Sequence, residues 1–311
     1  MQLHVVVGAG PVGRATANLL AEQGHEVKLV TRSGGGPEHP GIERVALDAS
    51  SSDALADAVE GAAVIYSCAS PPYTRWTKDF SPLAASILAV AQHTDAVLVM
   101  MGNLYGYGPV TGPMTPDLPL VAETRKGRVR AAASAAAFAA HAAGTVRATE
   151  ARASDFIGPA VRNSVGGARL VEPVLAGKPV GMLGDPDAPH SWTYADDAAR
   201  TLVALGGDSR AWGRAWHVPT DAAVSSRELV KQLSALADGP APKVRALPKP
   251  VLRAAALVSP MMRELAEIAY QYERPFVIDA SATTSTFGIQ PTPLVEALRA
   301  TLAWWRGAED G

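Results

Sequence analysis

The sequence of 311 residues has little of what marks several common classes of protein. Its single cysteine, Cys68, excludes an intramolecular disulfide framework and a metal site of the Cys-x-x-Cys type. No apolar run reaches the roughly 18 residues that a membrane-spanning helix requires, and no charged leader precedes the first apolar stretch. Lys and Arg total 28 against 30 Asp and Glu, so there is no basic excess to attract nucleic acid. We therefore expect a cytoplasmic protein that binds neither nucleic acid nor a membrane.

Two further absences narrow the chemistry. The seven histidines are scattered without the spacing of metal ligands, so we expect no metal site. No Gly-x-Ser-x-Gly motif is present, so the sequence does not support a serine hydrolase.

What the sequence does contain is a glycine-rich turn near its start. Residues 3–7 are apolar, residues 8–13 read Gly-Ala-Gly-Pro-Val-Gly, and the apolar residues that follow repeat at helical spacing. In such a strand, turn and helix, the first glycine permits the tight turn, the second lets the backbone approach a pyrophosphate, and the third lets helix and strand pack closely. The anion would lie on the helix N-terminus. The motif predicts a dinucleotide site that includes Gly8, Gly10, Pro11, Val12 and Gly13.

The end of the next predicted strand bears on the choice of cofactor. Residues 26–30 are followed by Thr31, Arg32 and Ser33 instead of an acidic residue. A carboxylate there would hold a ribose 2′-hydroxyl and repel a 2′-phosphate, whereas Arg32 can pair with that phosphate. We therefore expect NADP more than NAD, with these three residues in the cofactor site. The alternative is that Arg32 is a solvated loop residue.

Strand and helix patterns alternate through the first half of the chain. Further strands are predicted at 45–48, 63–69 and 96–101, and helices at 54–60, 82–93 and 131–143. Continuous apolar strands suit a sheet that is covered on both faces. The pattern predicts an α/β fold with a Rossmann-type, doubly wound parallel sheet in residues 1–155, to which about 190–220 return. Residues 156–311 are expected to form a smaller, discontinuous C-terminal substrate-binding lobe, with a helix at 260–272, a strand at 276–279 and a terminal helix at 292–306.

This order of elements, with several short motifs, resembles the extended branch of the short-chain dehydrogenase/reductase superfamily, of the nucleotide-sugar epimerase and dehydratase type. Residues 152–159 are similar to the branch's R-P-x-x-x-Y-G-P segment and residues 190–197 to its x-x-V-x-D-D segment. Asp48 falls where the branch places an aspartate near the adenine, and residues 68–70 where small residues lie along the cofactor. The resemblance implies a cofactor site completed by Asp48, Cys68, Ala69, Ser70, Asn103, Ser154 and Phe156.

The sequence departs from this family at the proton relay. The superfamily normally carries a Tyr-x-x-x-Lys pair after the fifth strand and a Ser or Thr at that strand's end; the phenol is the general acid/base and the ammonium lowers its pKa. Here residues 100–108 contain no Ser or Thr, and no tyrosine occurs between Tyr107 and Tyr194. The most similar pair at this i,i+4 spacing is Lys126 and Arg130. These two residues share a helical face, but neither is a tyrosine.

Several replacements remain open. Tyr105 or Tyr107, on a glycine-rich loop, could supply the phenol, with Lys126 as the nearby cation. Lys126, Arg128 and Arg130 could instead hold the cofactor ribose or an anionic substrate, or be solvated. The predicted catalytic residues are thus Tyr105, Tyr107 and Lys126, and the predicted substrate-binding residues are Tyr73, Arg130, His190, Trp192 and Tyr194.

The sequence therefore favours an NADP(H)-dependent oxidoreductase or epimerase-like enzyme of atypical extended type. It would act on a small carbonyl or hydroxyl substrate as a monomer or homodimer. Two alternatives stay open: a non-catalytic NADP-binding regulator or sensor that has lost the relay, and an enzyme that uses the same fold for non-redox chemistry.

Overall fold

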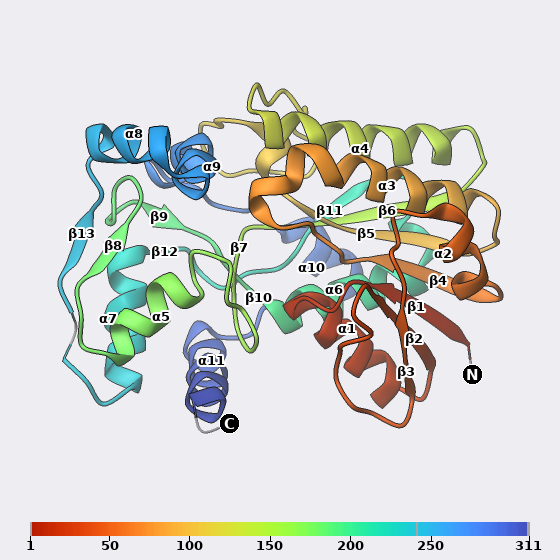
Figure 1. Cartoon of the computed structure of the whole chain (residues 1–311), viewed down its shortest axis with the longest axis horizontal. Helices are drawn as coiled ribbons and strands as arrows, with labels where there is room; N and C mark the ends of the chain where they lie inside the picture. Colours follow the sequence, from red (N-terminus) through yellow and green to blue (C-terminus); the bar gives the residue numbers. More distant parts are fainter. Residues whose placement is uncertain (1, 241, 310–311) are drawn as a thin grey trace.

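Seven parallel strands form the central sheet of the computed structural model, which describes residues 2–240 and 242–309 (Figure 1). The strands are β1 (Leu3–Val7), β2 (Glu26–Thr31), β3 (Ile42–Ala46), β4 (Ala62–Ser67), β5 (Val97–Asn103), β6 (Arg147–Ala153) and β11 (Ala215–His217). Their order across the sheet is β11-β6-β5-β4-β1-β2-β3. The chain therefore builds outward from β1 in both directions, and the reversal between β1 and β4 places a crevice at the carboxyl ends of these strands. The predicted fold class is confirmed.

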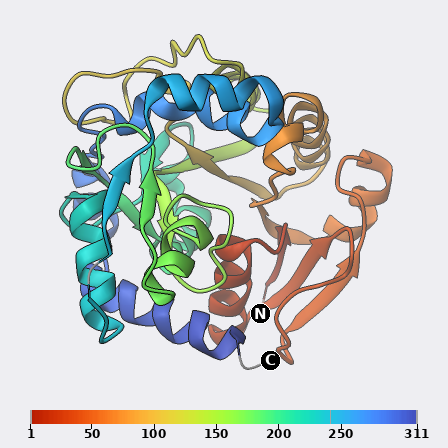
Figure 2. The ribbon, with the colours of Figure 1, turned by 60° about the vertical axis from the view of Figure 1, so that its left-hand side comes forward.

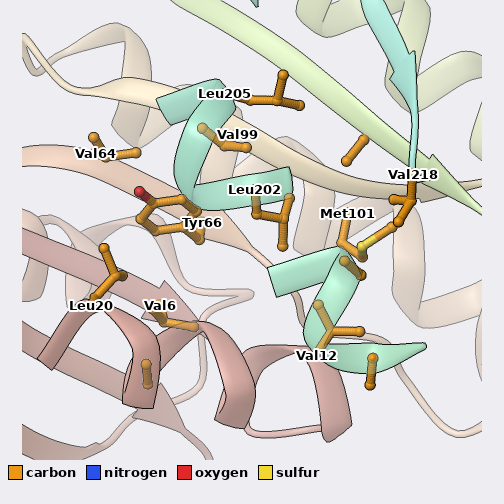
Figure 3. Close-up of a cluster of buried hydrophobic side chains, with 14 of the residues drawn as sticks. Val6, Val12, Leu20, Val64, Tyr66, Val99, Met101, Leu202, Leu205 and Val218 are labelled. Carbon is orange, nitrogen blue, oxygen red and sulfur yellow. The ribbon is translucent and has the colours of Figure 1, made fainter. Parts of the chain in front are cut away.

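Helices cover both faces of the sheet because successive strand side chains point to opposite sides. On one face, Val6 and Tyr66 pack with Leu20 of α1 (Pro11–Glu22) and Leu202 of α6 (Ala195–Gly207), as Figure 3 shows. The opposite face packs against α2 (Ser52–Val59), α3 (Trp76–Gln92) and α4 (Arg125–Ala142). The central strands β1, β4 and β5 are thereby buried on both sides, which explains their largely apolar sequences.

A smaller lobe packs around three short pairs of strands (Figure 2). The pairs are β7 (Asp155–Ile157) with β10 (Trp192–Tyr194), β8 (Val180–Met182) with β13 (Val244–Ala246), and β9 (Pro189–His190) with β12 (Val224–Ser225). Its helices are α5 (Ala168–Leu175), α7 (Ser226–Leu236), α8 (Lys249–Val258), α9 (Pro260–Ile268) and α11 (Leu294–Glu309). A further helix, α10 (Ser281–Phe287), lies against β11, where Phe287 meets the ring of Trp216.

Three local expectations were wrong. Helix α3 begins at Trp76, six residues before the predicted start, with Pro82 inside it, because the buried side chains of Trp76 and Phe80 anchor its first turns. Residues 276–279 make only isolated bridges, to His190 and Met114, and form no strand. The predicted helix at 260–272 ends at Ile268 and continues as a 3₁₀ turn, Ala269–Tyr272.

None of the described helices is both long and apolar enough to cross a bilayer.

Candidate functional site

A cleft of about 1440 Å³ lies between the carboxyl ends of the sheet strands and the smaller lobe. Its sheet side is formed by residues that follow β1, β2, β4 and β5, and its other side by residues 160–165, Met261, Leu265 and Phe276. A single small ligand usually occupies roughly 300–1,000 Å³. The cleft therefore has room for a dinucleotide and a second molecule beside it.

The three glycines of the turn have separate structural roles. Gly8 has φ +103°, and a Cβ there would lie 2.5 Å from the Cα of Ala69. A Cβ on Gly13 would collide with the carbonyl oxygen of Gly8, so Gly13 acts in packing and does not itself line the cleft. A Cβ on Gly10 would meet nothing within 4 Å. Only Gly10 therefore keeps open space that a ligand can fill.

This open space lies at the start of α1. Gly10 is the N-cap and offers no side chain to the unpaired N–H groups of the first turn, and Pro11 follows it. Uncapped N–H groups and the positive end of the helix dipole suit an anion. The residues present thus fit the pyrophosphate of a dinucleotide.

The loops after β2 and β3 form one end of the cleft. Arg32 is exposed there, and no ion pair of the described residues involves it. Thr31 donates to the carbonyl of Gly35 (3.1 Å) and Ser33 accepts from the Gly35 amide (3.3 Å), so both shape the loop around Arg32. The amide and hydroxyl of Ser50 donate to the Asp48 carboxylate at 3.0 and 2.8 Å and lower the pKa of Asp48.

The remaining predicted cofactor residues lie along the same cleft: Cys68, Ala69, Ser70, Asn103, Ser154 and Phe156. Burial raises the pKa of the Cys68 thiol to about 12. The thiol is therefore protonated at neutral pH and does not have the thiolate character of a nucleophile. Asn103 accepts a hydrogen bond from the amide of Tyr105 at 3.2 Å and so holds the start of the turn that carries this tyrosine.

Two tyrosines meet in the middle of the cleft. Tyr73 follows β4 and Tyr105 follows β5, and because these neighbouring strands end at the same edge, the two hydroxyl oxygens lie 3.2 Å apart. Burial raises the pKa of both phenols, so both are protonated at neutral pH.

Arg130 stands beside this pair. Its guanidinium donates to the carbonyl of Met101 (3.0 Å) and lies 4.7 and 4.2 Å from the ring centres of Trp76 and Phe80. Burial lowers the pKa of Arg130 to about 10, so it remains a cation at neutral pH. Its charge opposes the effect of burial on the pKa of Tyr105.

Tyr107 does not lie in the cleft, contrary to one of the predicted alternatives. The turn Tyr105–Tyr107 sends the two side chains to different sides. Arg152 donates to the Tyr107 hydroxyl at 2.7 Å, and this hydroxyl donates to Nε2 of His217 at 2.8 Å. With both partners buried, Tyr107 is a structural residue under the sheet edge.

Lys126 is also absent from the cleft wall. Its ammonium is fully buried and pairs with Glu264 and, at 3.2 Å, with Glu267, both on α9 of the smaller lobe. It also lies 4.7 Å from the ring centre of Tyr73. Because two carboxylates take up its charge, Lys126 joins the two lobes behind Tyr73 and does not face a substrate.

The three residues of the smaller lobe that were predicted to bind substrate do not line the cleft. His190 donates from Nε2 to Asp155 at 2.9 Å, Trp192 donates to the carbonyl of Val224, and the ring of Tyr194 packs on Gly158. The group that does face the cleft is Asp155, which also accepts from the Tyr272 hydroxyl at 2.5 Å. The prediction missed Asp155 as a site residue, although it lies between the predicted Ser154 and Phe156.

The cleft carries more positive than negative charge, although the chain as a whole has a formal charge of −2. Its cationic lining residues are Arg14, Arg32, Arg75, Lys78, Arg130, Arg162 and Arg169, and its acidic ones are Asp48, Asp79 and Asp155. Arg75 and Asp79 neutralise one another at 2.6 Å. The remaining excess of arginines suits anionic ligands.

No metal-binding arrangement accompanies these charges. In the part of the chain that the structure describes, no three His, Cys, Asp or Glu side chains converge on one position.

The protein therefore has two lobes and a Rossmann-type fold: a parallel sheet, a glycine turn where the strand order reverses, and a smaller lobe on the other side of the cleft. More particularly, the chain belongs to the NAD dependent epimerase/dehydratase family, whose model matches residues 4–213. No curated protein matches it by sequence.

Several solved structures share the whole fold. UDP-glucuronic acid 4-epimerase from Bacillus cereus, in complex with UDP-glucuronic acid and NAD, is 19% identical with a TM-score of 0.79 over 99% of this chain and 100% of that one. dTDP-glucose 4,6-dehydratase from Bacillus anthracis, with NAD, is 17% identical with a TM-score of 0.79 over 100% and 98%. The epimerase Mth375 from Methanothermobacter thermautotrophicus is 18% identical with a TM-score of 0.83 over 99% and 93%.

Proposed function

We propose that this chain is an NADP(H)-dependent oxidoreductase or epimerase-like enzyme that acts on the carbonyl or hydroxyl carbon of an anionic substrate. The observation that carries the proposal is the pair of protonated phenols, Tyr73 and Tyr105, in the same cleft as the glycine turn and beside Arg130. This pair takes the place of the Tyr-x-x-x-Lys relay.

The residues of the cleft divide between the parts of the cofactor. The glycine turn and the start of α1 would hold the pyrophosphate, Arg32 would hold the 2′-phosphate, and residues 68–70 with Asn103 would contact the rest of the cofactor. The bound nicotinamide supplies the hydride chemistry. NAD in the solved neighbours supports a nicotinamide dinucleotide of this kind, and Arg32 is the reason for proposing the phosphorylated form.

Tyr105 acts as the proton donor. A neutral phenol can give its proton to a substrate oxygen as negative charge develops there, and the nearby Arg130 stabilises the phenolate that remains. Tyr73 restores the proton across the 3.2 Å contact between the hydroxyls, and Tyr73 in turn takes a proton from solvent in the cleft that it lines. Because burial raises the pKa of both phenols, both hold their protons at neutral pH, which is the state that a proton donor needs for reduction of a carbonyl.

The substrate is proposed to carry a phosphate or carboxylate. Arg162 and Arg169, the latter on α5 of the smaller lobe, line the same cleft as the glycine turn. A sugar nucleotide has this chemistry, and one solved neighbour holds UDP-glucuronic acid.

The test is turnover of NADPH with a panel of carbonyl compounds, including 4-keto and 6-aldehyde sugar nucleotides. Once a substrate is found, Tyr105→Phe should lower turnover about 10²–10⁴-fold, because it deletes only the donor hydroxyl. Tyr107→Phe is the matched control, since it deletes a phenol of the same turn outside the cleft, and it should retain turnover while folded. Full turnover in both Tyr105→Phe and Tyr73→Phe would contradict the phenol mechanism.

A non-catalytic regulator or sensor is the second candidate, and the burial of Lys126 between two carboxylates favours it. That function predicts tight NADP(H) binding without turnover of any compound in the panel. Calorimetric titration of both nucleotides, run beside the turnover assay, separates the two functions.

A further inference from the structure

Helix α8 presents its apolar side to solvent. Val251, Leu257 and Val258 are 51%, 79% and 85% exposed, and Leu252 is the one side chain of this ten-residue helix that is buried. Met261, at the start of α9, is 39% exposed and continues the same surface. A surface helix ordinarily turns its apolar side to the core, so this arrangement is inverted. We call Val251, Leu257, Val258 and Met261 the apolar patch.

The segment around the patch is basic. From Gly239 to Arg263 the sequence contains five cations and no Asp or Glu; the cations are Lys243, Arg245, Lys249, Arg253 and Arg263. Lys249 pairs with Glu273 at 2.9 Å, and within the described residues none of the other four takes part in an ion pair. The nearest acidic residues of α9, Glu264 and Glu267, are taken up by Lys126 and Arg125. The positive charge beside the apolar patch is therefore uncompensated.

We propose that α8 and the start of α9 dock on the surface of an anionic lipid bilayer. A short helix with exposed apolar side chains and flanking cations inserts the former among the acyl chains while the latter meet acidic headgroups. Figures 1 and 2 show α8 at the periphery of the smaller lobe. Such docking is peripheral, and it departs from the expectation from the sequence that the protein binds no membrane.

Charge argues against a second copy of the chain as the occupant. In a twofold dimer each patch faces itself, so the cations of one copy would oppose those of the other. An anionic bilayer instead complements both the apolar and the basic part of the surface.

The position of Met261 implies that docking would bring the cleft close to the bilayer. Met261 belongs both to the apolar patch and to the lining of the cleft. On a docked molecule the rim of the cleft lies next to the lipid. The docking itself does not depend on the proposed enzymatic function.

The experiment is co-sedimentation of the full chain with vesicles of phosphatidylcholine alone and of phosphatidylcholine mixed with phosphatidylglycerol. We expect binding to the mixed vesicles that weakens as salt is added. Val258→Glu should weaken binding at least about tenfold, because it replaces an inserted apolar side chain by an anion. Arg253→Gln should weaken binding to the mixed vesicles about fivefold and should not affect the vesicles of phosphatidylcholine alone, because these carry no acidic headgroups. The control is Val295→Glu on α11, a partly exposed valine (39%) outside the apolar patch, and this variant should bind as the parent does.

Two results would overturn the proposal. One is an absence of binding to mixed vesicles at low salt by a parent chain whose circular dichroism shows it folded. The other is loss of a dimer in Val258→Glu by size-exclusion chromatography without vesicle binding by the parent, which would assign the face to a second copy. Leu257→Glu repeats the test at a second exposed position, so misfolding of one variant does not decide it.

Discussion

The proposed preference for NADP rests on Arg32. This residue is exposed at the end of the cleft, in a loop held by Thr31 and Ser33, and no carboxylate pairs with it among the described residues. Asp48 lies nearby: hydrogen bonds from Ser50 lower its pKa, and the Arg32 charge lowers it further. A 2′-phosphate would meet a guanidinium that forms no ion pair with another described residue.

Arg32→Ala should therefore weaken NADP binding by about 1.5–3 kcal/mol, the scale of a charged hydrogen bond, and leave NAD binding nearly unchanged. Isothermal calorimetry with both nucleotides measures this. Arg44→Ala is the control, because Arg44 is partly exposed on β3, pairs with Glu38 and does not line the cleft. Equal losses for the two nucleotides in Arg32→Ala would contradict the choice of NADP.

His217 is a buried base whose charge the fold does not accommodate. Its Nδ1 donates to the carbonyl of Asp279 and its Nε2 accepts from Tyr107, so the neutral ring satisfies both contacts. Burial, together with the Arg152 charge, lowers the pKa of His217 to about 4.

This lowered pKa predicts how stability depends on pH. Because the unfolded chain binds the proton near pH 6.5 and the folded chain only near pH 4, the free energy of unfolding should fall as pH decreases between these values. The loss from this group between pH 7 and 5 is about 2 kcal/mol. His217→Gln keeps a donor and an acceptor but binds no proton, so urea unfolding at both pH values should show a smaller loss in this variant. An equal loss in the two proteins would assign the dependence to other groups.

At the scale of elements, two glycines at the start of α1 have different roles: one leaves space for a ligand and the other is required for packing. Gly10 and Gly13 belong to one motif, but a side chain on Gly10 enters the open cleft while one on Gly13 collides with the backbone of Gly8. The same substitution at the two positions should therefore have different consequences.

Gly10→Val should abolish binding of NADP and NAD while the thermal unfolding midpoint stays close to that of the parent. Gly13→Val should lower this midpoint strongly, since the clash is with backbone that cannot move aside. Nucleotide titration and thermal unfolding of both variants measure the two effects. Native affinity in Gly10→Val would remove the glycine turn from the proposed site.

At the scale of the whole molecule, charged side chains of α4 and α9 hold the lobes together. Lys126 and Arg125 come from the sheet lobe, and Glu264 and Glu267 from the other. The Lys126 amide also donates to Glu267 at 2.8 Å. Burial by itself raises the pKa of Glu267, but the amide and ammonium of Lys126 outweigh it, so the pKa of this carboxyl is lowered.

Lys126→Met should destabilise the protein by about 3–5 kcal/mol, because it leaves two largely buried carboxylates without their buried cation. Arg128→Met, an exposed cation on the same helix, should change stability by less than about 0.5 kcal/mol. Urea unfolding at neutral pH measures both. Parent-like stability in Lys126→Met would show that the lobes are held by apolar packing alone.

The sequence by itself determined the sheet, most of its helices and the residues that line the cleft at the ends of the strands. Apolar alternation, the glycine spacing and the residues at strand ends act over a few neighbouring positions, and parallel strands bring their carboxyl ends to one edge whatever the rest of the chain does. This is why Gly10, Arg32, Asp48 and residues 68–70 line the cleft as expected.

Only the tertiary structure decided which polar side chains face that cleft. Tyr105 and Tyr107 are two residues apart, and the partners Arg152 and His217 draw Tyr107 away from it. Lys126 is buried by Glu264, which lies 138 residues further along the chain. The positions of Tyr107 and Lys126 each depend on contacts between segments that are distant in the sequence. The local pattern of either segment does not indicate such contacts or their energies.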